Sequence, residues 1–498
     1  PGGGGMNLAP RLQGALQALG YPAPALPPVL TDLTLDSRRV TPGAIFCAVP
    51  GRSQDGRAYL ADACARGAAL VLLPEGPRPE DQAVLGPVPA LVLPGIEGRL
   101  SELAHHVYGA PSESMTVIGV TGTNGKTSVV SHCASLLTAL GVPTATFGTL
   151  GVGFGDALTP TGLTTADPFT VQAALRRLCD DGAKAVAMEV SSHALDQGRV
   201  RAVAFDAAVM TNLSRDHLDY HGTLEAYGEA KRQLFLQPGL AHGIVNFEDP
   251  FCRKLLGRIP CAVKALGYAL DDEGAAVHLT ARKACGQGWS FQGQSPWGTF
   301  TGATGLVGEH GLSNLLAALS TLAALGYPLS ELAAQLVKVP AAPGRLERFT
   351  HPSGVEIFVD YAHTPEALTA ALAALRAQGV GRLHCIFGCG GERDAGKRPL
   401  MGAAAAVADA LYLTNDNPRG EDPDAILCAI ARGIPAGVPV QRIPDRAEAL
   451  AAALAQARPG DRILLAGKGH ETVQIGAEGA RPFSDRALAA ALCAGEGA

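Results

Sequence analysis

The sequence predicts an α/β protein of three domains, with a central parallel-sheet domain between a small N-terminal α/β domain and a C-terminal Rossmann-like α/β domain. Short apolar runs of strand length alternate with alanine-rich helical stretches along the whole chain, and this alternation is typical of parallel sheets. A glycine-rich loop joins one apolar run to a helix. With 498 residues, the chain is also too long for one hydrophobic core.

The expected domains cover residues 6–110, 111–341 and 342–498, and a parallel sheet is expected in each. The first has strands at Ala44–Val49 and Ala69–Leu73, and it ends near Ala110 and Pro111. The strands expected further along are Val117–Val120, Ala185–Met188, Ala207–Met210, Glu356–Asp360, Leu383–Phe387, Ala410–Leu413 and Arg462–Leu465.

Bulk composition excludes several classes of protein. A net charge of −6 provides no basic surface for nucleic acid. No apolar run reaches the roughly 18 to 20 residues of a membrane helix, so no membrane insertion is expected. The 11 cysteines are scattered, and the closest pair, Cys385 and Cys389, lacks the spacing of a zinc or redox motif. We therefore expect a cytoplasmic protein with free thiols.

The glycine-rich loop predicts a phosphate site in a P-loop-type ATPase domain. It follows the strand at Val117–Val120 and precedes an apolar helix at Ser128–Leu140. Such a loop offers backbone N–H groups to a polyphosphate, a lysine to its terminal oxygens and a hydroxyl to magnesium. The loop departs from the general pattern, since Val120 stands where the first glycine belongs. Its predicted ATP-binding residues are Gly122, Thr123, Asn124, Gly125, Lys126, Thr127 and Ser128.

Three further residues are candidates for the same chemistry. Glu189 ends an apolar strand, where open α/β sheets place ligand-binding residues, and its carboxylate is a hard ligand for magnesium. His217 lies in a loop between Asp216 and Asp219, a setting in which histidine is more often a hydrogen-bonded loop residue than a metal ligand. Lys231 falls on an expected helix, where a single lysine is usually solvated.

Taken together, five segments resemble the Mur ligase family, in the family's order and over nearly the whole chain. The segments are Gly122–Ser128, Met188–Leu195, Thr211–Gly222, Asp360–Pro365 and Gly388–Pro399. The resemblance implies an ATP-dependent ligase that forms an amide bond through an acyl phosphate. Within the family the chain is most similar to the ligase that adds a diamino acid to UDP-N-acetylmuramoyl-L-alanyl-D-glutamate.

The resemblance implies roles for residues whose local patterns alone are uninformative. His217 would hold a second metal, and Lys231 would be carbamylated and act as a metal ligand beside Thr127 and Glu189, with Lys126, Glu189, His217 and Lys231 as the catalytic set. Further ATP contacts would be Asn314, Arg345, Asp360 and Lys397. The UDP-substrate would be bound by Leu35, Ser37, Arg52, Ser53, Gln54, Thr164, Thr165, Ser191, Gln197 and Arg199.

The incoming amino acid would be selected by the segment Asp416–Arg419. This segment resembles the family's signature for meso-diaminopimelate, in which Arg419 would bind the distal carboxylate. Taken alone, Asp-Asn-Pro-Arg is a turn, and L-ornithine or L-lysine stays possible. The amino-acid-binding residues implied are Arg393, Asp416, Asn417, Pro418, Arg419, Gly467 and Glu471.

The sequence is also compatible with two other functions. A folylpolyglutamate-synthetase-like ligase would share the ATP loop, and a binding protein could use ATP as a switch without forming a bond. Gly311, which stands where the family usually has asparagine, fits an altered adenine site. We expect ATP and Mg²⁺ as cofactors, UDP-N-acetylmuramoyl-dipeptide and a diamino acid as partners, no nucleic acid, and a monomer.

Overall fold

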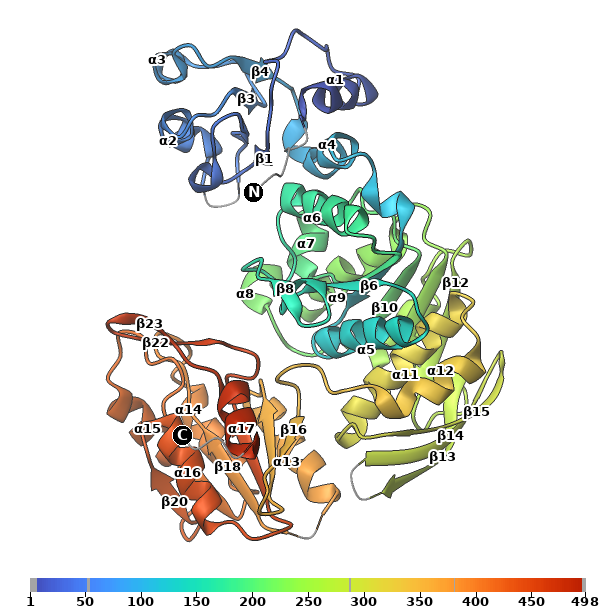
Figure 1. The fold of residues 1–498 in the computed structure, drawn as a ribbon, viewed down its shortest axis with the longest axis vertical. Coiled ribbons are helices and arrows are strands. Elements are labelled where there is room, and N and C mark those ends of the chain that lie inside the picture. The colour runs from blue at the N-terminus through green and yellow to red at the C-terminus, as the bar shows by residue number, and fades with distance from the viewer. Residues whose placement is uncertain (1–6, 52–53, 286–287, 380, 495–498) are drawn as a thin grey trace. The chain divides into compact units, whose positions relative to one another are not determined.

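The computed structural model describes residues 7–51, 54–285, 288–379 and 381–494 (Figure 1). The chain forms two compact units. The first comprises residues 1–126 and 141–266, and the second comprises residues 127–140 and 267–498. No helix among the described residues is long and apolar enough to cross a membrane.

The N-terminal part of the first unit is a four-stranded parallel sheet with strands in chain order. Its strands are β1 (Leu33–Thr34), β2 (Ile45–Cys47), β3 (Leu70–Leu73) and β4 (Ala90–Val92). Its helices are α1 (Ala9–Ala18), α2 (Leu60–Ala65), α3 (Pro79–Leu85) and α4 (Leu100–Val107). β2 and β3 are fully buried because each face of the sheet contributes to a separate hydrophobic core.

The rest of the first unit is a larger sheet with the strand order β11-β10-β5-β9-β6-β7-β8. Its strands are β5 (Thr116–Thr121), β6 (Thr144–Gly148), β7 (Gly151–Phe154), β8 (Ala157–Thr159), β9 (Ala185–Glu189), β10 (Ala207–Met210) and β11 (His242–Asn246). Its helices are α6 (Pro168–Asp180), α7 (Ser192–Asp196), α8 (Leu218–His221), α9 (Leu224–Arg232) and α10 (Pro250–Leu256). The five strands from β11 to β6 are parallel, so their carboxyl ends share one edge.

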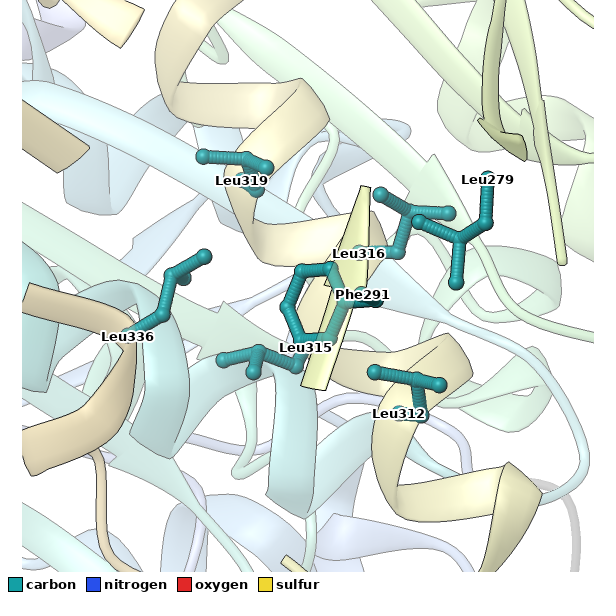
Figure 2. A pocket seen from close by; sticks show the side chains of 7 residues that line it. All are labelled: Leu279, Phe291, Leu312, Leu315, Leu316, Leu319 and Leu336. Carbon is teal, nitrogen blue, oxygen red and sulfur yellow. The ribbon is translucent and has the colours of Figure 1, made fainter. Parts of the chain in front are cut away.

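The second unit begins with the helix α5 (Lys126–Ala139), whose residues from Thr127 onward belong to it. It continues with β12 (Lys264–Ala269), whose residues from Gly267 onward belong to it. Three antiparallel strands follow, namely β13 (Val277–Cys285), β14 (Gly288–Ser295) and β15 (Gly298–Thr304), and then α11 (Gly308–Ala324) and α12 (Leu329–Gln335). Figure 2 shows how leucines of α11 face Leu279 of β13 and Phe291 of β14. Only apolar side chains line this pocket, so it closes a core and offers no polar group to a ligand.

The C-terminal part of the second unit is a six-stranded sheet in the order β16-β17-β21-β18-β19-β20. Its strands are β16 (Glu347–Thr350), β17 (Glu356–Asp360), β18 (Leu383–Phe387), β19 (Ala410–Leu413), β20 (Val440–Arg442) and β21 (Arg462–Ala466). Its helices are α13 (Pro365–Ala377), α14 (Lys397–Ala405), α15 (Pro423–Ala431), α16 (Arg446–Gln456) and α17 (Asp485–Ala494). All pairs except β16 with β17 are parallel, and a separate hairpin is formed by β22 (Val473–Gly476) and β23 (Gly479–Pro482).

Every strand predicted from the sequence is present, with ends within two residues of those expected. The expectation of parallel sheets throughout was wrong in part. β7, β8, β13, β14, β15 and β16 pair in antiparallel fashion. In β14 buried and exposed residues alternate, which is typical of an antiparallel strand with one face in the core.

A buried ion pair joins the first residues of α16 and α17. Arg446 and Asp485 both have side chains that are 0% exposed, and Arg446 Nε donates to Asp485 Oδ1 at 2.9 Å. The same guanidinium donates to the carbonyl oxygens of Ala466, at 3.0 Å, and Asn415, at 3.5 Å. The pair therefore fixes the backbone at the carboxyl ends of β19 and β21.

We predict that Arg446→Met lowers the free energy of unfolding of this sheet by about 3 to 5 kcal/mol, because it leaves the Asp485 carboxylate buried and unpaired. Urea-dependent hydrogen exchange of peptides from β19 and β21 measures the loss. The double variant Arg446→Met/Asp485→Leu should lose less free energy of unfolding than the single variant, because it leaves no buried charge unpaired. An equal or larger loss in the double variant would contradict this account.

Candidate functional site

The glycine-rich loop lies between β5 and α5 and is fixed by the end of β10. Gly122 has φ of 142°, and a Cβ there would lie 1.9 Å from Thr211 Oγ1. Thr211 Oγ1 donates to the carbonyl oxygen of Asn124 at 2.5 Å, and the Asn124 N–H donates to Asn212 Oδ1 at 3.0 Å. Glycine is needed at position 122 because the neighbouring strand leaves no room for a side chain.

Two lysines converge on one carbonyl of this loop. Lys126 Nζ and Lys231 Nζ each donate to the carbonyl oxygen of Gly122 at 2.8 Å. Lys231 is 1% exposed on α9, and its Nζ lies 4.5 Å from the centre of the Tyr227 ring. Burial, and next the charge of Lys126, lower the pKa of Lys231 well below its usual value. A lower pKa favours the neutral amine, the form of a lysine that can act as a nucleophile.

Glu189 ends β9 and is held by Thr149, a residue that the sequence did not identify. The Thr149 N–H donates to Glu189 Oε1 at 2.9 Å, and its hydroxyl donates to Oε2 at 3.1 Å. A Cβ on Gly148, the last residue of β6, would lie 2.4 Å from Glu189 Oε1, so a larger residue there would displace the carboxylate. Only the pairing of β6 with β9 brings Thr149 to this carboxylate, and sequence spacing does not reveal that pairing.

His217 lies among other histidines at the end of the first unit's sheet. Its backbone has φ of 51°, and its Nε2 lies 3.4 Å from Asp216 Oδ2. The rings of His193 and His217 are 4.9 Å apart, and His221 Nε2 lies 3.0 Å from Ser192 Oγ. The described residues contain no group of three or more His, Cys, Asp or Glu side chains that could hold a metal. A metal there would need ligands from a substrate, water or modified Lys231.

The five central residues assigned to the UDP-substrate lie in one hydrogen-bond network. Arg199 donates to the carbonyl oxygen of Thr165 at 2.8 Å and, through Nε and Nη2, to Gln197 Oε1. The Ser191 N–H donates to Thr165 Oγ1 at 3.0 Å, and Thr164 Oγ1 lies 3.1 Å from Thr149 Oγ1. Thr165 Oγ1 donates to the carbonyl oxygen of Glu189 at 2.9 Å, so the network reaches Glu189 directly, and Thr164 joins it through Thr149.

Tyr220 extends this network to the histidine loop and was also missed in the sequence. Its hydroxyl accepts from Gln197 Nε2 at 2.9 Å and donates to Asp196 Oδ2 at 2.8 Å. Its ring lies 4.1 Å from that of His193. The Tyr220 N–H donates to the carbonyl oxygen of His217 at 3.2 Å, so Tyr220 links the residues assigned to substrate with His217, which is assigned to metal.

In the N-terminal sheet, Leu35 and Ser37 follow β1 at its carboxyl end. Ser37 is buried, and Asp36 caps the turn by accepting from the Arg38 N–H at 3.0 Å. Gln54 Oε1 accepts from the Tyr59 hydroxyl at 2.6 Å. Arg52 and Ser53 lie outside the described residues.

In the second unit, the predicted ATP residues Arg345, Asp360 and Lys397 gather around the loop after β17. Asp360 accepts from the Leu346 N–H at 2.7 Å and the Ala362 N–H at 2.8 Å. The Arg345 guanidinium lies 5.0 Å from the centre of the Tyr361 ring, and Lys397 Nζ donates to the carbonyl oxygen of His363 at 3.0 Å. Asn314 is half-buried on α11.

The residues assigned to the amino acid lie in three loops, which follow β18, β19 and β21. Asn417 Nδ2 donates to Glu471 Oε2 at 3.0 Å, and Arg419 Nη1 donates to the carbonyl oxygen of Gly391 at 2.8 Å. Arg419 has φ of 53°, and Pro418 lies in the same turn. Gly467 has φ of 110° and approaches Asp416, whereas Arg393 is exposed. Asn417 and Glu471 are thus in contact, and the Arg419 side chain lies against the carbonyl oxygen of Gly391.

Family models match two long parts of the chain: the Mur ligase middle domain over residues 120–322, and the Mur ligase glutamate ligase domain over residues 344–469. A relative from Ectopseudomonas mendocina, named UDP-N-acetylmuramoyl-L-alanyl-D-glutamate–2,6-diaminopimelate ligase, is 47% identical over 92% of this chain and 93% of its own length. A relative of the same name from Pseudomonas aeruginosa is 47% identical over 93% of this chain and 96% of its own length.

Solved structures of related ligases have a similar fold. A structure titled UDP-N-acetylmuramoyl-L-alanyl-D-glutamate–2,6-diaminopimelate ligase has a TM-score of 0.68 at 34% identity, covering 94% of this chain and 95% of that chain. Folylpolyglutamate synthase of Mycobacterium tuberculosis, complexed with ADP, shares the fold at a TM-score of 0.61 and 20% identity, covering 74% of this chain and 91% of that chain. With the matched domains and relatives of nearly full length, this chain belongs to the Mur ligase family.

Proposed function

We propose that the protein is an ATP-dependent ligase that joins meso-diaminopimelate to UDP-N-acetylmuramoyl-L-alanyl-D-glutamate in peptidoglycan precursor synthesis. The names of the relatives at 46–47% identity support this reaction. We further propose that it acts as a monomer in the cytoplasm, where ATP is made available to biosynthesis. All 11 cysteines are free thiols, which fits a reducing compartment.

The observation that carries the proposed amino acid is the way Arg419 is anchored. Its Nη1 donates hydrogen bonds to the carbonyl oxygens of Gly391 and Asn417. Among the described residues, Nε and Nη2 have no hydrogen-bond partner, and these two groups form one side of the guanidinium fork. That side suits two parallel hydrogen bonds to a carboxylate. Diaminopimelate has a distal carboxylate, whereas lysine and ornithine do not.

The phosphate loop supports ATP as the second substrate. Lys126, the glycines and the start of α5 would bind the phosphates, and Arg345, Asp360, Lys397 and Asn314 would supply further contacts. Magnesium held by Glu189, Thr127 and His217 would neutralise phosphate charge. Within this set, the Glu189 carboxylate and the Thr127 hydroxyl are oxygen ligands of the kind that magnesium takes, and water and phosphate oxygens would complete its shell.

The proposed reaction has two steps. The carboxylate of the dipeptide's D-glutamate attacks the γ-phosphorus of ATP, so that a C–O–P bond forms and ADP leaves. The neutral amine of the diamino acid then attacks the acyl carbon, the amide bond forms, phosphate leaves with the C–O bond electrons, and the amine gives up a proton. Arg199 would hold the dipeptide, and the Lys126 ammonium group would stabilise charge on the transferred phosphoryl group.

The test is ADP release with UDP-N-acetylmuramoyl-dipeptide and meso-diaminopimelate, L-lysine or L-ornithine in parallel, with the product mass recorded. We expect turnover with diaminopimelate and a mass increase equal to one diaminopimelate residue. Preference for lysine or ornithine would support the ligase activity but contradict diaminopimelate as the added amino acid. Folylpolyglutamate extension would favour the alternative ligase, and no turnover would favour an ATP-regulated binding protein.

We predict that Lys231→Ala lowers kcat by at least about 100- to 1000-fold, because it removes the amine that would carry the carbamate beside the phosphate loop. Steady-state ADP release measures the loss, and added formate or acetate should restore part of the rate by standing in for the carbamate. Lys254→Ala on α10 is the control, since Lys254 is exposed. Full activity of Lys231→Ala would remove the carbamate from the mechanism.

We predict that Arg419→Asn raises KM for diaminopimelate by about 10- to 150-fold, the usual value of hydrogen bonds to a charged group. Asparagine suits the test because it tolerates the left-handed backbone at this position. KM for ATP should stay unchanged, and the exposed Arg432→Ala is the matched control. An unchanged KM for diaminopimelate would show that Arg419 does not bind the distal carboxylate.

A further inference from the structure

Lys468 is a buried cation to which neither the sequence nor the proposed reaction assigns a role. It follows β21 directly after Gly467, and its side chain is 0% exposed. Gly469, on its other side, has φ of 51°, and a Cβ there would lie 2.7 Å from Tyr361 Cβ. The backbone therefore turns sharply around Lys468 and directs its side chain inward. A buried ammonium needs acceptors to offset its desolvation.

The acceptors are the side chains assigned to the amino acid. Lys468 Nζ lies 2.8 Å from Glu471 Oε2, 3.1 Å from Asn417 Oδ1 and 3.9 Å from Asp416 Oδ1. Asn417 and Lys468 lie in loops after different strands, β19 and β21. One ammonium group therefore joins both loops of the cluster.

These contacts determine which atoms stay available. Lys468 and Asn417 Nδ2 both bind Glu471 Oε2, so among the described residues Glu471 Oε1 is left without a partner. Asn417 Oδ1 accepts from Lys468 and from the Ile475 N–H at 2.9 Å, which fixes the orientation of its amide. Glu471 Oε1 is therefore left to accept from one ammonium group.

We propose that Lys468 is a positioning residue for the distal amine of the incoming diamino acid. It holds Glu471 by Oε2, presents Oε1 to the ammonium group, and keeps Asn417 and Asp416 in the same cluster. Lys468 itself is buried and does not touch the substrate. This inference rests on the proposed function and extends it by assigning the residue that orients the amine acceptor.

The test is the KM of Lys468→Met for each of the three substrates. We expect KM for diaminopimelate to rise about 10- to 100-fold, because Glu471 and Asn417 lose their shared charged donor. KM for ATP and for the UDP-dipeptide should change by less than about twofold. A merely structural role would lower the amount of active enzyme without this split. The exposed Lys338→Met is the control and should leave all three KM values unchanged.

A double-mutant cycle shows whether Lys468 acts through Glu471. Lys468→Met should raise KM by less than about twofold when it is added to Glu471→Gln, since the acceptor that it positions is already lost. If the two substitutions instead raised KM by factors that multiply in the double variant, the proposal would be overturned. If Lys468→Met does not accumulate as folded protein, Lys468→Gln, which keeps one donor without the charge, carries the same comparison and should show a smaller rise in KM.

The wild-type protein in the same assay separates the two hypotheses. Turnover of diaminopimelate by the wild type, with an unchanged KM in the Lys468 variants, would overturn the role of Lys468 and leave the ligase in place. Failure of the wild type with every diamino acid would overturn the proposed function and this inference with it.

Discussion

Parallel strand pairing is the constraint on which the candidate site depends. It brings the carboxyl ends of β5, β9, β6 and β10 to one edge, where the glycine-rich loop, Glu189, Thr149 and Thr211 follow. In the second unit the same pairing places Asp360, Asp416 and Gly467 after β17, β19 and β21. Parallel strands must be covered on both faces, so polar groups gather where the strands end.

Three buried basic side chains show that the effect of burial depends on the acceptors around the charge. Arg446 lies against Asp485, and Lys468 lies against Glu471 and Asn417, so both have acceptors that offset the cost of burial. Lys231 has a backbone carbonyl as its acceptor, and Lys126 on the same carbonyl raises the cost of its charge. Lys231 is therefore suited to reaction as a neutral amine, whereas Arg446 and Lys468 are suited to holding loops in place.

The sequence predicted those features that depend on local pattern. Apolar runs located β5, β9 and β19, and the motifs at 122–128 and 416–419 located the loops that follow β5 and β19. Features that depend on strand order were missed. Thr149 meets Glu189 only because β6 lies beside β9, and Lys468 meets Asn417 across 51 residues. The antiparallel strands β13 to β15 were also missed, because polar alternation there lacks the long apolar runs that mark parallel strands.

The segment Asp416–Arg419 does not act as an isolated motif, because the hairpin of β22 and β23 fixes it. The Arg419 N–H donates to the carbonyl oxygen of Ile475 at 3.0 Å, and Gln474 Nε2 donates to that of Asp416 at 2.7 Å. The left-handed turn at Arg419 then sends its side chain toward Gly391. In the proposed function, selection between diamino acids would therefore depend on where this hairpin holds the guanidinium, and a displaced hairpin would remove the proposed carboxylate contact even with the same four residues.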